Sequence, residues 1–270
     1  MTILASTTDL TVTFPRRRSL GDWRPDPFVA VDRASVEIRA GEITALVGES
    51  GSGKSTLARA LLRLVDFTGT ATVDGIDVGS LPRQAPLDYR RRVQAVFQEP
   101  IQALNPRHEV RDLIGEPLRI HTDLSGAARE RRVVELLESV GLSADHLART
   151  SRELSGGQRQ RVAIARAVAV EPSLLILDEA LSALDVTTAA SVARLLRGML
   201  RPETAMLFIG HDLAVVRQLC DRVCVMRAGQ VVESGLADEV CGAPQHEYTK
   251  LLIGSIPRLV RDDAAQRRTA

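Results

Sequence analysis

The stretch that decides the fold is Gly48-Glu49-Ser50-Gly51-Ser52-Gly53-Lys54-Ser55, followed by Thr56. It matches the pattern G-x-x-x-x-G-K-[ST]. An apolar run at residues 43–47 precedes it, and Leu57, Leu61 and Leu64 follow it at the spacing of one helix face. The sequence therefore predicts a buried strand, a glycine-rich turn and a helix, in that order.

The glycines of this loop allow a tight turn whose successive N–H groups point at phosphate oxygens. We expect Lys54 to place its charge beside the β- and γ-phosphates of a nucleotide and Ser55 to offer its hydroxyl to Mg²⁺. The helix that follows adds the positive end of its dipole. A glycine-rich turn without function is the alternative, and the flanking strand and helix disfavour it.

Four apolar runs lack polar alternation, which is typical of buried parallel strands. They cover residues 43–47, 93–97, 174–177 and 206–209, and the residues at their ends are Gly48, Gln98, Asp178 and His211. In open α/β sheets, ligands bind beyond the carboxyl ends of the strands. We therefore expect these four residues to converge on one site.

Two carboxylates, Asp178 and Glu179, end the third of these runs. Asp178 suits Mg²⁺, held through water, and Glu179 suits the orientation and polarisation of an attacking water molecule. An ordinary acidic strand end would be as good an explanation on its own. The presence of the phosphate-binding loop in the same chain favours the catalytic interpretation.

A second candidate anion site is Ser155-Gly156-Gly157-Gln158, which follows Leu154 and opens a predicted helix. Taken alone, this segment would be a simple helix cap. One chain needs only one phosphate cradle, so we expect the Ser155 segment to close on a nucleotide held by another subunit.

The remaining segments surround this sheet. Residues 68–78, with the Asp74-Gly75 turn, predict an antiparallel hairpin, and residues 110–169 predict a mostly helical block between the second and third strands. The expected fold class is α/β, and the glycine-rich loop resembles that of P-loop NTPases, which implies a P-loop NTPase (RecA-like) core with an antiparallel β subdomain and an inserted α-helical subdomain. We expect a single domain over residues 1–255, with the helical subdomain at about 105–169 and a polar tail at 256–270.

The composition argues against several classes of protein: nucleic-acid binders, membrane-spanning chains and secreted chains. The chain has 270 residues, 44% of them hydrophobic, and its 35 basic and 34 acidic side chains give a net charge of +1, which argues against a nucleic-acid partner. No apolar run reaches the ~18 residues that span a bilayer, and the first ten residues do not resemble a signal peptide.

The sparse cysteines, Cys220, Cys224 and Cys241, suggest a reducing compartment. A metal site at Cys220 and Cys224 is less favoured than a buried strand, because no further ligands complete it.

Together, these residues resemble the ordered motif set of ABC ATPases, over nearly the whole chain. The set comprises the phosphate-binding loop, Gln98, the Ser155 segment, the Asp178-Glu179 pair, Ser182-Ala183-Leu184-Asp185 and His211. The resemblance implies a head-to-tail dimer with two ATP molecules between the loop of one subunit and the Ser155 segment of the other. It also implies that Gln98 contacts Mg²⁺ and couples to a permease, that His211 binds the γ-phosphate and that Asp185 bridges the subunits.

Members of this family also stack an aromatic ring on adenine. Phe14 matches best by position, and Trp23 and Phe28 are its rivals.

A narrower resemblance is to the dipeptide, oligopeptide and nickel importer branch. It rests on residues 48–56, on Phe97-Gln98-Glu99-Pro100 through Leu104-Asn105-Pro106-Arg107, on Glu116-Pro117-Leu118-Arg119 and on Pro244-Gln245-His246-Glu247-Tyr248-Thr249. The chain departs from the branch at Ala180-Leu181, where Pro-Thr is common, at Gly210, where Thr is common, and at Glu247, where Pro is usual.

This branch implies a subunit on the cytoplasmic face of the cell membrane that powers uptake of short peptides, nickel or metal chelates. Its partners would be a second ABC ATPase subunit, two transmembrane permease subunits and, indirectly, an extracytoplasmic solute-binding protein. The two ATPase subunits would form a heterodimer of homologous chains, with a homodimer as the alternative. The alternatives are a soluble ABC ATPase that acts on ribosomes or DNA and an ABC-type subunit of a phosphonate-degrading complex.

Overall fold

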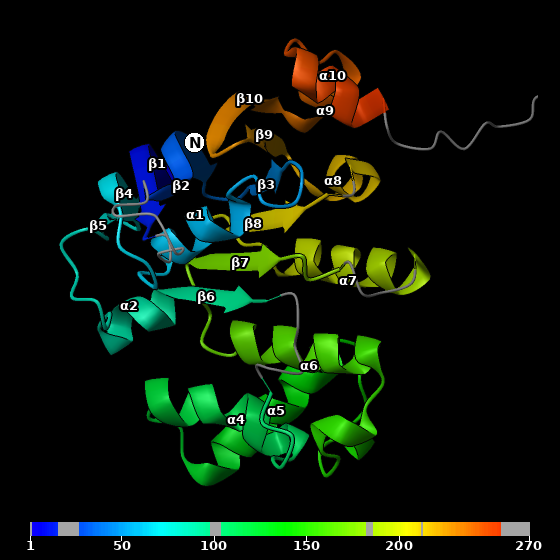
Figure 1. Ribbon diagram of the computed structural model, residues 1–270. Coiled ribbons are helices and arrows are strands. Elements are labelled where there is room, and N and C mark those ends of the chain that lie inside the picture. Colours follow the sequence, from blue (N-terminus) through cyan, green and yellow to red (C-terminus); the bar gives the residue numbers. More distant parts are fainter. Residues whose placement is uncertain (1, 16–26, 98–103, 182–185, 212, 255–270) are drawn as a thin grey trace, which may run out of the picture.

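A computed structural model describes residues 2–15, 27–97, 104–181, 186–211 and 213–254 (Figure 1). Its strands are β1 Ile3–Phe14, β2 Phe28–Arg39, β3 Ile43–Val47, β4 Thr68–Val73, β5 Ile76–Asp77, β6 Val93–Val96, β7 Leu174–Asp178, β8 Ala205–Gly210, β9 Arg222–Arg227 and β10 Gln230–Leu236. Its helices are α1 Lys54–Leu61, α2 Leu87–Arg92, α4 Val110–His121, α5 Gly126–Ser139, α6 Gly156–Val168, α7 Val186–Met199, α8 Leu213–Leu219, α9 Ala237–Gly242 and α10 Glu247–Gly254, with short 3₁₀ turns η1 Ala144–His146 and η2 Ser151–Glu153.

The larger sheet has the strand order β10-β9-β3-β8-β7-β6. All its neighbouring pairs are parallel except β10 with β9. The four predicted strands are therefore β3, β6, β7 and β8, and their carboxyl ends meet at one edge of the sheet. Cys224 lies buried in β9, as expected from its apolar neighbours.

A smaller sheet has the order β2-β1-β4-β5 and is antiparallel throughout, including the predicted hairpin of β4 and β5. Helix α1 lies between the two sheets. Leu57 of α1, Leu46 of β3 and Val31 of β2 belong to one buried cluster, because alternate β3 side chains face this layer. The side chain of Ile43 faces the opposite core, under the other helices.

The end of α1 differs from the sequence prediction. The helix stops at Leu61, and Leu64 is 57% exposed instead of continuing the apolar face. Arg63 has the left-handed backbone angle φ 58°, and the Leu64 N–H donates to the Arg59 carbonyl at 2.8 Å. This left-handed residue closes the helix and turns Leu64 outward.

Helices α4, α5 and α6 gather beyond the β6 edge of the large sheet, and α9 and α10 lie near its opposite edge (Figure 1). Val133, Leu136 and Leu137 bury one face of α5, and Gly141 follows the helix end with φ 72°. The chain enters this helical block after β6 and leaves it into β7, so the block is an insertion between neighbouring strands.

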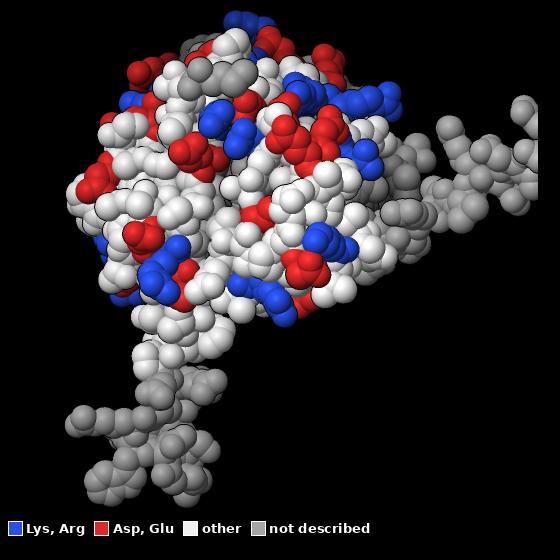
Figure 2. All heavy atoms as spheres, turned by 90° about the horizontal axis from the view of Figure 1, so that it is seen from above, with Lys and Arg blue, Asp and Glu red and all other residues white. Residues whose placement is uncertain are grey.

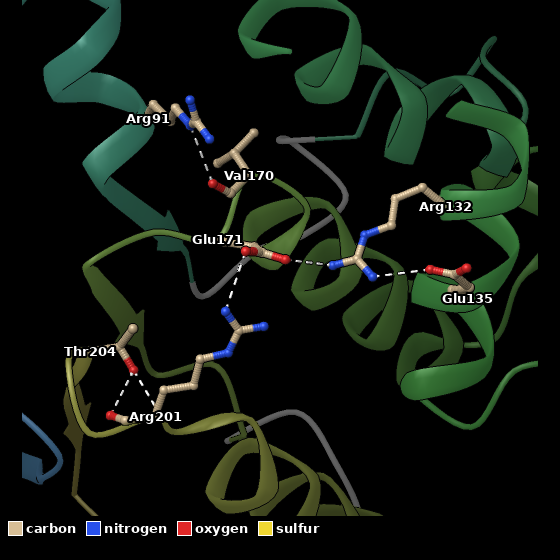
Figure 3. A network of polar contacts seen from close by, with 7 residues as sticks. All are labelled: Arg91, Arg132, Glu135, Val170, Glu171, Arg201 and Thr204. Carbon is tan, nitrogen blue, oxygen red and sulfur yellow. Dashed lines mark hydrogen bonds and ion pairs between the residues drawn. The ribbon is translucent and has the colours of Figure 1, made fainter. Parts of the chain in front are cut away.

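An ionic network joins the helical block to the sheet (Figure 3). Glu171, just after α6, pairs with Arg132 of α5 at 2.9 Å and with Arg201, after α7, at 3.3 Å. Arg91 of α2 also donates to the neighbouring Val170 carbonyl at 3.5 Å. Because these side chains are partly exposed, each ion pair contributes only about 0–1 kcal/mol, and the network chiefly fixes orientation.

The surface charges, the cysteines and the helix lengths also bear on the predictions from composition. Acidic and basic side chains are intermixed on the face seen in Figure 2. All three cysteines are buried and free of disulfides, and burial raises the pKa of Cys224 to about 12. Within the described ranges, no helix has the length and apolar character needed to cross a bilayer.

Candidate functional site

The glycine-rich loop joins β3 to α1 and is pressed against backbone on both sides. Gly48 has φ 151°, and a Cβ atom there would lie 2.1 Å from the Met226 carbonyl oxygen. Gly53 has φ 105°, and its Cβ would lie 2.4 Å from the Ala30 carbonyl oxygen. Neither position accepts a side chain, so these glycines fix the path of the loop between β9 and β2.

Lys54 is the first residue of α1, and the loop wraps around its ammonium group. Its Nζ donates to the carbonyl oxygens of Gly48 at 2.9 Å and Glu49 at 2.8 Å, with the Ser52 hydroxyl at 3.4 Å. Burial lowers the pKa of Lys54, and the nearby Glu179 and Asp178 carboxylates oppose this shift. The loop therefore presents one cation at its centre.

Other loop residues differ in their exposure. Glu49, Ser50 and Gly51 are exposed, whereas Ser52 is buried. Ser55 and Thr56, which follow Lys54 in α1, are half-buried.

Ser55 connects the loop to the end of β7. Its hydroxyl donates to Asp178 Oδ1 at 3.0 Å. Burial raises the pKa of Asp178, and this hydrogen bond opposes the shift. A hydroxyl and a carboxylate oxygen are hard ligands of the kind that Mg²⁺ prefers, so this pair fits the predicted magnesium site.

The number of protein ligands at Ser55 and Asp178 also suits magnesium. Among the described residues, no group of three or more His, Cys, Asp or Glu side chains could hold a metal ion. Mg²⁺ commonly takes one or two protein oxygens and completes its shell with water and phosphate. Gln98, the third predicted ligand, lies outside the described residues.

Glu179 lies at a sharp turn at the carboxyl end of β7. Its backbone angle φ is 49°, a left-handed conformation, and its N–H donates to the Ile209 carbonyl of β8 at 2.9 Å. His211 follows β8 two residues after Ile209 and is exposed. The structure thus brings Glu179 and His211 to the ends of adjacent strands, beside the loop.

The Ser155 segment forms the start of α6 and caps it. The Ser155 hydroxyl accepts from the Gln158 N–H at 3.3 Å, and the Gln158 side-chain oxygen accepts from the Ser155 N–H at 2.9 Å. Ser155 is exposed, and a Cβ atom at Gly156 would meet nothing within 4 Å. The helix cap is therefore present, and Gly156 leaves open space at the head of α6, where Gly157 follows.

Two of the three candidate adenine-stacking aromatics are described. Phe14 and Phe28 are register partners in the β1–β2 pair and are 36% and 49% exposed. Ala30, whose carbonyl lies against Gly53, is two residues from Phe28. Both rings therefore lie on the strand pair that borders the loop, while Trp23 and Asp185 fall outside the described residues.

One contact of the loop was missed by sequence reasoning. The Glu49 N–H donates to the Tyr248 hydroxyl at 3.0 Å, across 199 positions of the chain. The motif at residues 244–249 marked the importer branch, but no local pattern connected its tyrosine with the loop.

Comparison with known proteins identifies the family of the chain. The family described as ABC transporter matches residues 31–182. The chain is 47% identical over 246 residues to YejF of Escherichia coli strain K12, named an uncharacterized ABC transporter ATP-binding protein, and covers 46% of that longer protein with 90% of its own length. It thus spans about half the length of this curated relative.

A second relative is the oligopeptide transport ATP-binding protein OppF of Streptococcus mutans serotype c (strain ATCC 700610 / UA159), 44% identical over 84% of this chain and 75% of that protein. Among solved structures, the dimeric post-hydrolysis ATP-binding cassette MJ0796, bound to ADP and Pi, superposes with a TM-score of 0.76 at 26% identity. That superposition covers 86% of this chain and 98% of the other. The glycine-rich loop, the carboxylate pair and these matches together place the chain in the ABC transporter family.

Proposed function

We propose that this chain is the ATP-hydrolysing subunit of an ABC importer that takes up short peptides. The observation that carries the proposal is the 3.0 Å contact between Ser55 of the loop and Asp178 of β7, with Glu179 next in the chain. At this edge of the sheet the Lys54 ammonium group, the oxygens of Ser55 and Asp178 and the candidate base Glu179 lie together. The names of the relatives, which specify peptide or oligopeptide transport, support the solute class. They do not address nickel or metal chelates, and they do not favour the non-transport alternatives.

Each described residue at this edge has a role that its position supports, and the role of Gln98 rests on the family resemblance alone. Mg-ATP, when bound, would supply the phosphoanhydride bond that is hydrolysed, and Mg²⁺ would partly neutralise the negative charge of the phosphates. Lys54, at the centre of the loop, would donate to the β- and γ-phosphate oxygens. Ser55 and Asp178, with Gln98, would hold Mg²⁺, Glu179 would orient the attacking water, and His211 would contact the γ-phosphate.

The second half of the site would come from a partner ATPase subunit. The helix start at Ser155, Gly156, Gly157 and Gln158 is exposed at its first two residues, with open space beside Gly156, which suits the nucleotide of a second subunit. The dimeric state named for the MJ0796 cassettes supports such an arrangement. Asp185 would bridge the two subunits, and Phe14 or Phe28 would stack on adenine.

A groove of about 410 Å³ supports docking of the permease pair. It lies between the sheet edge at β6 and helices α4 and α6, and Leu64 and Ile120, 57% and 50% exposed, lie on it. Exposed aliphatic side chains beside a groove suit an apolar partner segment. In this proposal the chain binds permeases at the cytoplasmic face of the membrane, and a solute-binding protein acts on the opposite side.

The test compares the chain's only two lysines. Lys54→Ala should weaken ATP binding by at least about tenfold and abolish hydrolysis, because it removes a charged donor to phosphate. Lys250→Ala should leave both unchanged, since Lys250 is exposed and pairs with Glu247 at 2.7 Å. Calorimetric titration with Mg-ATP measures binding, and phosphate release measures turnover.

Uptake is tested separately, with this subunit and its permease partners reconstituted in vesicles. Short peptides should enter only with ATP and only with an intact Lys54. ATP hydrolysis without peptide uptake would reject the transport assignment, and absence of hydrolysis would reject the ATPase assignment.

A further inference from the structure

A single peptide group, between Gly48 and Glu49, forms hydrogen bonds at both its carbonyl and its N–H. Its carbonyl, on Gly48, accepts from Lys54 Nζ at 2.9 Å. Its N–H, on Glu49, donates to the Tyr248 hydroxyl at 3.0 Å. The orientation of this one peptide plane therefore connects the loop's central cation with a side chain of the C-terminal helix α10.

Tyr248 is itself held firmly. Its side chain is 3% exposed, and Arg227 of β9 lies over its ring at 4.9 Å. The start of α10 is fastened to β10, because Glu233 accepts from the backbone N–H groups of Gln245 at 2.8 Å and His246 at 3.0 Å. The hydroxyl is thus a fixed acceptor on a rigid support.

The peptide that it holds needs such a support. Gly48 has φ 151°, in a region where a glycine backbone has wide rotational freedom, and Glu49 is exposed. Without an acceptor for the Glu49 N–H, rotation of this plane would move the Gly48 carbonyl away from Lys54 and change the shape of the phosphate cradle.

We propose that Tyr248 is a positioning residue for the phosphate-binding loop, through which helix α10 sets nucleotide affinity. The inference rests on the proposed function, because it concerns the same loop. Tyr248 touches no reacting atom in this scheme. Its hydroxyl preorganises the loop, so its loss should weaken binding and leave the chemical step intact.

The experiment removes only the hydroxyl. Tyr248→Phe keeps the buried ring and its contact with Arg227, and the full-length chain is used throughout. We expect Kd for ATP and for ADP to rise about three- to tenfold, the loss of one hydrogen bond, with kcat within about twofold of the wild type. The KM for ATP should rise in step with Kd.

A matched control is Tyr89→Phe. Tyr89 is 2% exposed and donates to the backbone carbonyl of Leu61, so it also loses a buried tyrosine hydrogen bond, at the far end of α1. We expect Tyr89→Phe to lower the thermal midpoint without changing either Kd.

Three results would overturn the role of Tyr248. They are unchanged affinity in Tyr248→Phe, a fall in kcat as large as the rise in KM, and an equal loss of affinity in Tyr89→Phe. If the wild type binds neither nucleotide, the proposed function fails and this inference fails with it. Normal wild-type binding with an unaffected Tyr248→Phe rejects Tyr248 alone.

Discussion

At the scale of single residues, Glu179 combines a strained backbone with a carboxylate at the proposed reaction site. A non-glycine residue at φ 49° costs about 1 kcal/mol or more, and such residues gather at functional sites. Glu179→Gln keeps this cost and the side-chain shape but removes the charge that would polarise water. We expect turnover to fall on the order of a hundredfold or more, with ATP still bound and closed dimers accumulating.

Phosphate release and ATP affinity measure this effect in the same preparation. Glu130→Gln, an exposed carboxylate of α5, is the control and should behave as the wild type. Near-normal hydrolysis by Glu179→Gln would remove Glu179 from the proposed role.

Sequence reasoning at this scale succeeded where a pattern is local. The loop and the Asp178-Glu179 pair each directly follow an apolar strand, so their common sheet edge could be predicted, although their chemical roles stay proposals. The Tyr248–Glu49 bond could not be predicted, because it joins residues 199 positions apart. Phe14 and Phe28 remain equal candidates for stacking on adenine, since they are register partners in the antiparallel β1–β2 pair.

At the scale of elements, Asp221 ties three of them together. It accepts from the Ile43 N–H at the start of β3 at 2.8 Å and from both terminal nitrogens of Arg197, in α7, at 2.5 and 2.6 Å, just before β9 begins. Burial opposes the charge on Asp221, but these hydrogen bonds hold the pKa of its carboxyl below the ordinary value. Asp221→Asn should therefore destabilise the fold at neutral pH, by about 2 kcal/mol.

The pH dependence of this effect has a definite sign. A depressed pKa stabilises the folded chain above the unfolded value of about 3.9, and that contribution is lost as pH falls through the folded value. The gap between wild type and Asp221→Asn in urea unfolding should be constant from about pH 5.5 to 8 and should shrink below about pH 4. A gap that persists undiminished in acid would show that charge is not the cause.

Elements were more predictable than their ends. Apolar runs without alternation identified β3, β6, β7 and β8. Strands β3, β7 and β8 are buried throughout, whereas the edge strand β6 is only partly buried. The end of α1 was missed, because the left-handed turn at Arg63 has no glycine to signal it.

At the scale of the whole molecule, the proposed composite site requires a second subunit. Ser155→Arg would place a bulky side chain where the partner's γ-phosphate approaches. We expect ATP affinity of the isolated chain to change little, whereas ATP-dependent dimerisation and hydrolysis are lost. Nucleotide titration and light scattering on the same variant measure the two properties.

A control for this variant is Ser80→Arg, at an exposed position after β5. It should dimerise normally. Loss of ATP binding in the Ser155→Arg monomer would mean that this segment serves its own nucleotide, and the head-to-tail arrangement would be wrong. The subdomain limits at 105–169 and the domain end at 255 stay predictions.

The strand order also determines when β3 can pair with its neighbours during synthesis. Strand β3 ends at residue 47, yet its neighbours are β8 and β9, which begin at residues 205 and 222. A chain emerging from the ribosome can pair β1 with β2 and β4 within its first 73 residues. The glycine-rich loop then remains attached to an unpaired central strand until β8 and β9 have been made. The strand that carries the nucleotide site is thus made well before its neighbours, since it gains both of them only when residues 205–227 appear.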